Sequence, residues 1–188
     1  YKKLFVIAVE GNKTEPQYFA LFKNQRSLIR INCLRSKHNS SPPHVLERMK
    51  HHLKKERIRS SDEAWLVVDK DNWTEDQLNQ LLAWSNESDH HGFALSNPKF
   101  EFWLLLHFES ADGVNSSREC SDRLKRYLPN YDKGIDARKI TDDNIQDAIR
   151  RAKERDNPPC EDWPRNFGTT VYRLVERILE NSTETQIT

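Results

Sequence analysis

The chain has 188 residues with 30 basic and 29 acidic side chains, so its formal net charge is only +1 at pH 7. This length can bury a sizeable hydrophobic core, and the balanced charge by itself points to neither a nucleic-acid-binding nor a membrane-binding protein. Its three cysteines, Cys33, Cys120 and Cys160, lie far apart and form no CxxC pair, which argues against a zinc site or a disulfide framework and indicates a reducing compartment.

The first half of the chain alternates short apolar runs with longer amphipathic segments. Short runs rich in β-branched residues predict strands, and the segments between them predict helices. We predict strands at residues 4–9, 28–34, 64–68 and 92–95, and helices at 15–24, 44–57 and 74–86. Thr14 and Thr74 are the expected N-caps of the first and third helices. This order is typical of a parallel sheet with helices on both faces.

The second half of the chain shows no further strand pattern. Residues 100–108 are apolar almost all round, as in a buried helix, and we predict further helices at 116–128, 142–155 and 169–181. The sequence therefore predicts an α/β fold with a parallel, four-stranded sheet. The sheet would form a catalytic core of residues 1–110, and residues 111–188 would be a helical C-terminal extension packed on that core.

Acidic side chains follow three of the predicted strands, at the point where each strand ends. Glu10 follows the first strand, Asp69 and Asp71 follow the third, and Glu101 follows the fourth. Ligands of open parallel sheets bind beyond the carboxyl ends of the strands, and carboxylate oxygens are the ligands that Mg²⁺ prefers. Asp69 and Asp71 would point to the same side if their segment stays extended. The sequence therefore predicts an electronegative pocket that holds one or two divalent ions for phosphodiester chemistry.

Several residues beside these acids have both a functional and a purely structural interpretation. Gly11 allows a tight turn or the close approach of a phosphate. Glu101 either supports the metal site or is a favourable charge at a helix N-terminus. Asn97 either orients the site or forms an Asx turn before Pro98, and His107 is either a core histidine or part of the site.

Four motifs of the chain resemble those of a known protein family. They are residues 10–19, 67–71, 96–108 and 166–176, with the sequences EGNKTEPQYF, VVDKD, SNPKFEFWLLLHF and NFGTTVYRLVE. Together they look like the signature motifs of the RloB-like family, which includes the AbiLii abortive-infection proteins. The resemblance extends over nearly the whole chain. It departs from the family at Lys70, where arginine is usual, and at Phe167, where proline is often found.

The resemblance implies a Toprim fold, a Rossmannoid catalytic domain shared by topoisomerases, bacterial primases and OLD-type nucleases. It implies the strand order 2-1-3-4 and a Mg²⁺ site formed by Glu10, Asp69 and Asp71. In the nuclease hypothesis the ion is Mg²⁺ or Mn²⁺, and Glu10 acts as a general acid or base or binds one ion. Family members are encoded in phage-defence loci, often beside an ATPase, which is the expected partner. The residues expected to support this site are Glu101, Gly11, Thr14, Asn97 and His107.

Two basic clusters are candidates for contacts to a nucleic-acid backbone, which requires positive charge more than sequence readout. Solvated helix faces explain the same clusters equally well. Lys133 is the candidate cation for stabilising the scissile phosphate. The candidate backbone contacts are Lys54 and Lys55, within residues 44–59, and Arg123 and Arg126 further along the chain.

Four functions remain open at this point. The leading hypothesis is a metal-dependent nuclease that cleaves DNA or RNA in anti-phage defence together with an ATPase. The alternative is a non-catalytic regulatory subunit that docks on such an ATPase. A receiver-like phosphoacceptor domain would need a lone aspartate after the third strand and a fifth strand, and the sequence shows neither. Nucleotidyl transfer, as in primases, is the fourth.

The surroundings of the protein are predicted from what the sequence lacks. No apolar run approaches the roughly 18 residues of a membrane span, and no signal peptide is visible, so we expect no membrane association and a cytoplasmic location. Because the chain begins at Tyr1 rather than at a methionine, we expect that residues precede it. Assembly into a homo-oligomer is left open.

Overall fold

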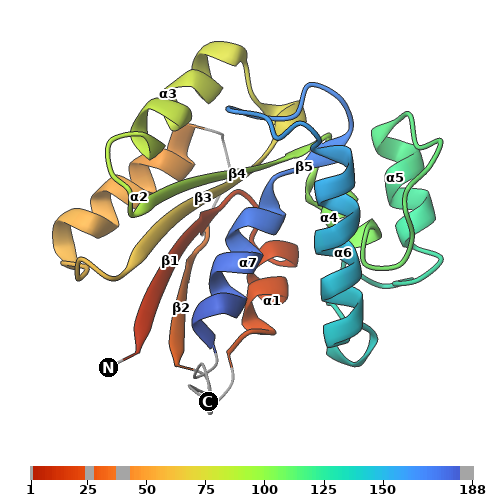
Figure 1. Cartoon of the computed structure of the whole chain (residues 1–188), viewed down its shortest axis with the longest axis horizontal. Helices are drawn as coiled ribbons and strands as arrows, with labels where there is room; N and C mark the ends of the chain where they lie inside the picture. Colours follow the sequence, from red (N-terminus) through yellow and green to blue (C-terminus); the bar gives the residue numbers. More distant parts are fainter. Residues whose placement is uncertain (1, 24–27, 37–42, 183–188) are drawn as a thin grey trace.

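The computed structural model describes residues 2–23, 28–36 and 43–182, and within these it has five strands and seven α-helices (Figure 1). The strands form one sheet in the order β2-β1-β3-β4-β5. The first four strands are parallel, and β5 is antiparallel to β4. The strands are β1 (Lys3–Val9), β2 (Ile29–Leu34), β3 (Glu63–Asp69), β4 (His91–Asn97) and β5 (Gly168–Thr169).

Helices cover both faces of the sheet. In Figure 1, α2 and α3 lie on one face, α1 and α7 lie on the other, and α4, α5 and α6 lie beyond α7. Two short 3-10 helices, η1 (Lys70–Asn72) and η2 (Ala137–Lys139), complete the elements of the described residues. The α-helices are α1 (Thr14–Ala20), α2 (Pro43–Lys55), α3 (Glu75–Ser85), α4 (Phe100–Leu105), α5 (Ser117–Leu124), α6 (Asp142–Arg155) and α7 (Val171–Ser182).

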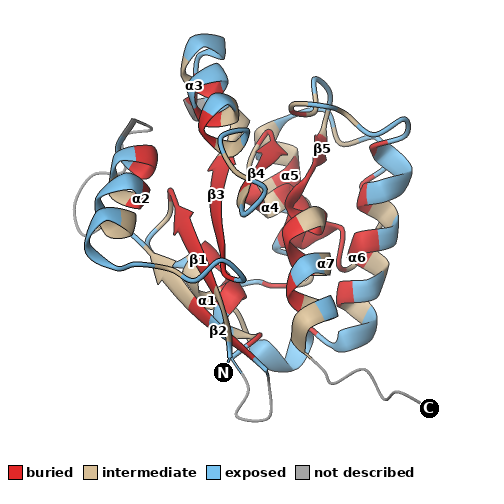
Figure 2. Ribbon diagram, turned by 60° about the vertical axis from the view of Figure 1, so that its left-hand side comes forward, coloured by how far each residue is buried: buried red, intermediate tan, exposed pale blue. Residues whose placement is uncertain are grey.

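The alternation of side chains along the central strands creates a hydrophobic core on each face of the sheet. In β1, Phe5 and Ile7 pack with α1, α4 and α7, whereas Val6 and Ala8 pack with α2 and α3. Strands that are buried on both faces consist of continuous apolar residues, which is why the predicted strands are so apolar. Figure 2 shows β1, β3 and β4 as buried along most of their length.

The strand order 2-1-3-4 is present among the parallel strands, but the prediction of only four strands is wrong. β5 extends the sheet at the edge of β4, where Ser96 lies opposite Thr169 and Asn97 lies opposite Gly168. The hydroxyls of Ser96 and Thr169 are 2.8 Å apart, which joins the two strands further. A strand of two residues is too short to show an alternating pattern, so its partner strand defines it rather than its own sequence.

Only some of the predicted helix ends and capping residues are found in the structure. Thr74 forms the predicted N-cap of α3, within a capping box that includes Gln77. The predicted cap at Thr14 is wrong: Lys13 occupies the N-cap position without a side-chain cap bond, and Thr14 is the first residue of α1. Three helices end well before their predicted ends at residues 24, 108 and 128: α1 ends at Ala20, α4 at Leu105 and α5 at Leu124. Asn24 itself lies outside the described residues.

The second half of the chain packs directly on the sheet. Val171, Leu174 and Ile178 of α7 share one core with the sheet face formed by Phe5 and Ile7. This shared packing does not test the division into a core of residues 1–110 and an extension of residues 111–188, which stays a prediction. None of the described helices combines the length and the apolar character that crossing a bilayer requires.

Candidate metal centre

An open pocket of about 380 Å³ lies at the carboxyl ends of β1 and β3. It is the position at which open parallel sheets bind ligands. Among the residues that the structure describes, five acidic side chains and one lysine line the pocket, so the pocket is strongly electronegative. The lining residues are Glu10, Gly11, Asn12, Lys13, Thr14, Glu15, Asp69, Glu101, Tyr131 and Asp132.

Glu10 and Asp69 are held together by hydrogen bonds. The backbone N–H of Asp69 donates to Glu10 Oε1 over 2.8 Å, and the indole N–H of Trp73 donates to the same oxygen. The backbone N–H of Phe100 donates to Asp69 Oδ1 over 2.9 Å. Because β1 and β3 are neighbours, with Val9 opposite Val67, their acidic ends meet at one edge of the sheet. Both carboxylates are thus fixed by groups from other parts of the fold.

Glu15 is the principal residue of this pocket that the sequence analysis missed. It lies in the first turn of α1 and is buried. Its carboxylate lies so close to Gly11 that a Cβ at that position would be 1.9 Å from Glu15 Oε2, so any larger residue there would displace the Glu15 carboxylate. Burial, above all, together with the negative charges of Glu101 and Glu10, raises the pKa of Glu15 from 4.5 to about 7. Its place in the pocket could have been predicted from the sequence, because Glu15 is an acid in the first turn of the helix that follows the first strand.

The same crowding acts on Asp69. Burial raises the pKa of its carboxyl well above the usual range, and the charges of Glu15, Glu10 and Glu101 add to this effect. A cation bound in this pocket would offset the repulsion between the carboxylates, and carboxylate oxygens are suitable ligands for a hard divalent ion. In the described part of the chain, however, no three acidic, histidine or cysteine side chains have the spacing of a metal-binding group. The carboxylates would therefore have to rotate to share one ion.

A family model described as RloB-like protein matches residues 5–178, a range that includes every residue lining the pocket. The chain belongs to the RloB-like protein family. No curated protein and no solved structure matches this RloB-like chain. The family assignment therefore rests on the match to the family model, and the arrangement of the pocket comes from the structure.

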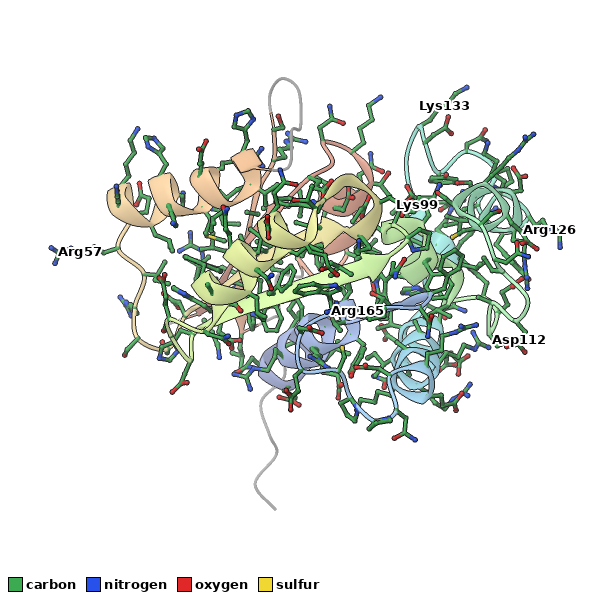
Figure 3. The ribbon with its side chains drawn as sticks, turned by 90° about the horizontal axis from the view of Figure 1, so that it is seen from above. Arg57, Lys99, Asp112, Arg126, Lys133 and Arg165 are labelled. Carbon is green, nitrogen blue, oxygen red and sulfur yellow. The ribbon has the colours of Figure 1, made fainter. Side chains whose placement is uncertain are left out.

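Two of the predicted catalytic residues of this RloB-like protein, Asp71 and Lys133, are not among the described residues that line the pocket. The backbone turns into η1 directly after Asp69, so the alternation of an extended segment is lost, and Asp71 is exposed. The backbone N–H of Asp71 donates to the carbonyl oxygen of Pro98 over 3.2 Å. Lys133 is exposed in the turn after Asp132 and projects from the molecule in Figure 3.

The basic residues predicted to contact nucleic acid are distributed over distant parts of the RloB-like chain. Lys54 and Lys55 are exposed at the end of α2, far from the pocket. Arg123 is ion-paired with Glu109, and its guanidinium also donates to the carbonyl oxygen of Asp112 over 2.6 Å. Arg126 is exposed, and Figure 3 shows Arg126 and Arg57 at opposite ends of the molecule. These residues do not form one surface.

Asn97 and His107 serve the packing of the RloB-like fold and lie outside the described lining of the pocket. The Asn97 amide donates to the carbonyl oxygen of Pro164 over 3.0 Å. His107 is fully buried, and its Nδ1 lies 3.0 Å from the carbonyl oxygen of Trp103. Since a carbonyl only accepts, Nδ1 carries the proton, and Nε2 accepts from the Tyr18 hydroxyl over 2.9 Å. This arrangement matches the interpretation of His107 as a core histidine.

Replacing His107 by glutamine is expected to reduce the acid sensitivity of the RloB-like fold. Burial, above all, lowers the pKa of His107 from 6.5 to about 4. As the pH falls below 6.5, the unfolded chain takes up this proton before the folded chain does. Stability is therefore lost between pH 6.5 and about 4, by about 3 kcal/mol in total at about 1.4 kcal/mol for each pH unit.

Urea unfolding of wild-type and His107→Gln proteins over this pH range measures the effect. The exposed His90, replaced in the same way, is the matched control, and it should leave the pH dependence unchanged. If His107→Gln and wild-type proteins lose stability in parallel as the pH falls, the buried neutral imidazole is not the cause.

Proposed function

We propose that this RloB-like protein is a nuclease with a Toprim-like fold that depends on Mg²⁺ or Mn²⁺ and hydrolyses phosphodiester bonds of DNA or RNA. The observation that carries the proposal is the hydrogen-bonded pair of Glu10 and Asp69 at adjacent parallel strand ends. Glu15 and Glu101 line the same pocket and add to its negative charge. The parallel strand order β2-β1-β3-β4 agrees with the order that the family resemblance implies for a Toprim fold.

The chain's own residues have distinct tasks in this proposal. A divalent ion, when bound, would polarise a phosphoryl oxygen and make a nucleophilic water available at neutral pH. Glu10 and Asp69 would hold the ion, because backbone and indole donors already orient their carboxylates. Glu15 has a pKa of about 7 in the metal-free pocket, which suits a group that takes up and releases a proton near neutral pH. Glu15 is therefore a second candidate for the acid–base role, beside Glu10 in the same pocket.

Three further roles stay predictions. Asp71 as a third metal ligand requires its exposed side chain to turn toward the pocket. Glu101 already lines the pocket and would support the ion from the first turn of α4. Lys133 would approach a bound phosphate only if the turn after Asp132 brings its ammonium group inward.

The biological setting is proposed from the family alone. The resemblance implies an anti-phage defence protein that works with an ATPase encoded nearby. An alternative is that the chain is a non-catalytic docking subunit of such a complex. The lack of three metal-spaced side chains among the described residues favours this alternative. Calorimetric titration with Mn²⁺ separates the two, because a docking subunit with a structural pocket would bind no ion.

A cleavage panel tests the nuclease proposal directly. The protein is incubated with duplex DNA, single-stranded DNA and total cellular RNA, with Mg²⁺, with Mn²⁺ or with EDTA, and with or without the neighbouring ATPase. We expect at least one substrate to be cleaved in a divalent metal and to remain intact in EDTA. If no nucleic acid is cleaved in any combination, the protein is not a nuclease of this kind.

A further inference from the structure

A second concave surface lies at the amino edge of the sheet, at the other end of β1 and β2 from the acidic pocket. It is a groove of about 630 Å³ between the starts of these two strands and the segment that follows α2. We call it the amino-edge groove. Its charged lining residues are Lys2, Arg30, Arg57, Arg59, Glu56 and Asp62.

The charge that the amino-edge groove presents to solvent is positive. Among the described lining residues, the four basic ones, Lys2, Arg30, Arg57 and Arg59, are all exposed, and they outnumber the one exposed acid, Glu56. Asp62, by contrast, is buried, and its carboxylate accepts hydrogen bonds from the backbone N–H groups of Leu4, at 2.9 Å, and Arg59, at 2.8 Å. Its negative charge is therefore satisfied by the backbone below the groove. In a chain of net charge +1, this is a local excess of positive charge.

The exposed face of α2 connects the two edges of the sheet. The helix passes the carboxyl edge at Arg48, which donates to the carbonyl oxygens of Val9, at 2.9 Å, and Leu34, at 3.4 Å. It reaches the amino-edge groove at His52, and Figure 3 shows Arg57 projecting beyond the end of the helix. The exposed ionisable residues of α2 are His44, Glu47, Lys50, His51, Lys54 and Lys55.

The chemistry of this surface favours a phosphate backbone. Guanidinium groups match phosphate oxygens with two parallel hydrogen bonds, and lysines add charge without sequence readout. Among the described residues that line the groove, His52 has the only ring, so the groove offers no platform for stacked bases. The exposed lysines of α2, Lys50, Lys54 and Lys55, lie in its last two turns, next to the groove, and so extend the positive charge of the groove along the helix.

We propose that the amino-edge groove and the exposed face of α2 bind the backbone of a nucleic acid that extends from the acidic pocket. β1 has seven residues, so the two edges of the sheet are roughly 20 Å apart, which corresponds to about six steps of 3.4 Å along a duplex. A substrate that is shorter than this reaches only one of the two surfaces. The length requirement rests on the proposed nuclease function, whereas binding to the groove does not depend on cleavage.

Binding measured in EDTA tests the groove independently of catalysis. Fluorescence anisotropy with labelled long and short duplexes and single strands is compared for the wild type and for the double variant Arg30→Ala and Arg57→Ala. We expect a larger Kd for the variant, and a salt dependence of log Kd that is shallower by about 2, since each phosphate contact contributes about 0.9 to that slope. The matched control replaces Arg118 and Arg138, whose side chains are 92% and 90% exposed, by alanine, and should bind as the wild type does.

Each further result has a defined meaning. An unchanged Kd and salt slope in the groove variant, or no binding by the wild type, overturns the proposal. Binding of poly-glutamate is measured in the same way. If the groove variant keeps its affinity for nucleic acid but loses its affinity for poly-glutamate, the proposal is also overturned, because the groove would then bind an acidic polypeptide. If all proteins bind as expected but none cleaves, the nuclease proposal fails while the groove remains a nucleic-acid-binding surface.

Discussion

If the proposed nuclease function holds, replacing Asp69 by asparagine is expected to lower the metal-dependent cleavage by at least about 10³-fold while leaving the protein folded. Divalent-metal assistance supplies several kcal/mol to such reactions, and each 1.36 kcal/mol corresponds to about a tenfold change in rate. Asparagine keeps an oxygen that accepts the hydrogen bond from the Phe100 N–H, so the start of α4 stays in place. Alanine at this position would leave the Phe100 N–H without its partner and lower the stability of the fold. A loss of activity could then not be distinguished from a loss of stability.

Cleavage rates of purified wild-type and variant proteins, together with their thermal unfolding, measure this effect. The exposed Asp89, replaced by asparagine, is the matched control and should retain full activity. Asp71→Asn belongs in the same series, because a loss as large as that of Asp69→Asn would show that Asp71 joins the metal site. An Asp69→Asn protein that cleaves at the wild-type rate would remove the acidic pocket from the mechanism.

Glu15→Gln is expected to stabilise the metal-free protein at alkaline pH. The pKa of Glu15 is raised from 4.5 to about 7, so the folded chain holds this proton more tightly than the unfolded chain does. The stabilisation is fully present below pH 4.5 and is lost as the pH rises through about 7. At about 1.4 kcal/mol for each pH unit, the loss amounts to about 3 kcal/mol, and glutamine removes it because its amide does not ionise.

Urea unfolding in EDTA at about pH 5 and about pH 8 measures this difference between wild-type and Glu15→Gln proteins. Addition of Mg²⁺ at the higher pH should stabilise the wild type, because an ion that binds only the folded state shifts the unfolding equilibrium. The exposed Glu87, replaced by glutamine, is the control and should follow the wild type. Equal pH dependence of Glu15→Gln and wild type would show that burial and the neighbouring carboxylates do not raise the pKa of Glu15 in the folded protein.

The elements of the fold were largely predictable because their signals are local. The apolar runs that end at Glu10 and at Asp69 are strands in the structure, and the segment of residues 142–155 is a helix with the same ends. Side-chain alternation, helical periodicity and capping residues depend on neighbours within a few positions, so they can be recognised without the fold. The family motifs are equally local, and the family match agrees with them.

The composition of the pocket was predictable only in part. Strand-end positions brought Glu10 and Asp69 to the same edge, but they gave no reason to select Glu15. Glu15 enters the pocket because α1 begins immediately beyond the carboxyl end of β1, where its first turn faces back toward Gly11. Asp71 leaves it because the chain turns into η1 one residue after the strand ends.

The residue types, their periodicity and the family motifs were enough to identify the strands, the helices and the acidic strand ends. Contacts between segments that are distant in the sequence could not be predicted from these local features. Three such contacts depend on how the chain returns to the sheet: the pairing of β5 with β4, the entry of Glu15 into the pocket, and the amino-edge groove between Arg30 and Arg57. The reason is physical. Backbone hydrogen bonds within a helix and side-chain alternation along a strand are set by near neighbours, whereas contacts between segments depend on the strand order and the crossovers of the whole fold.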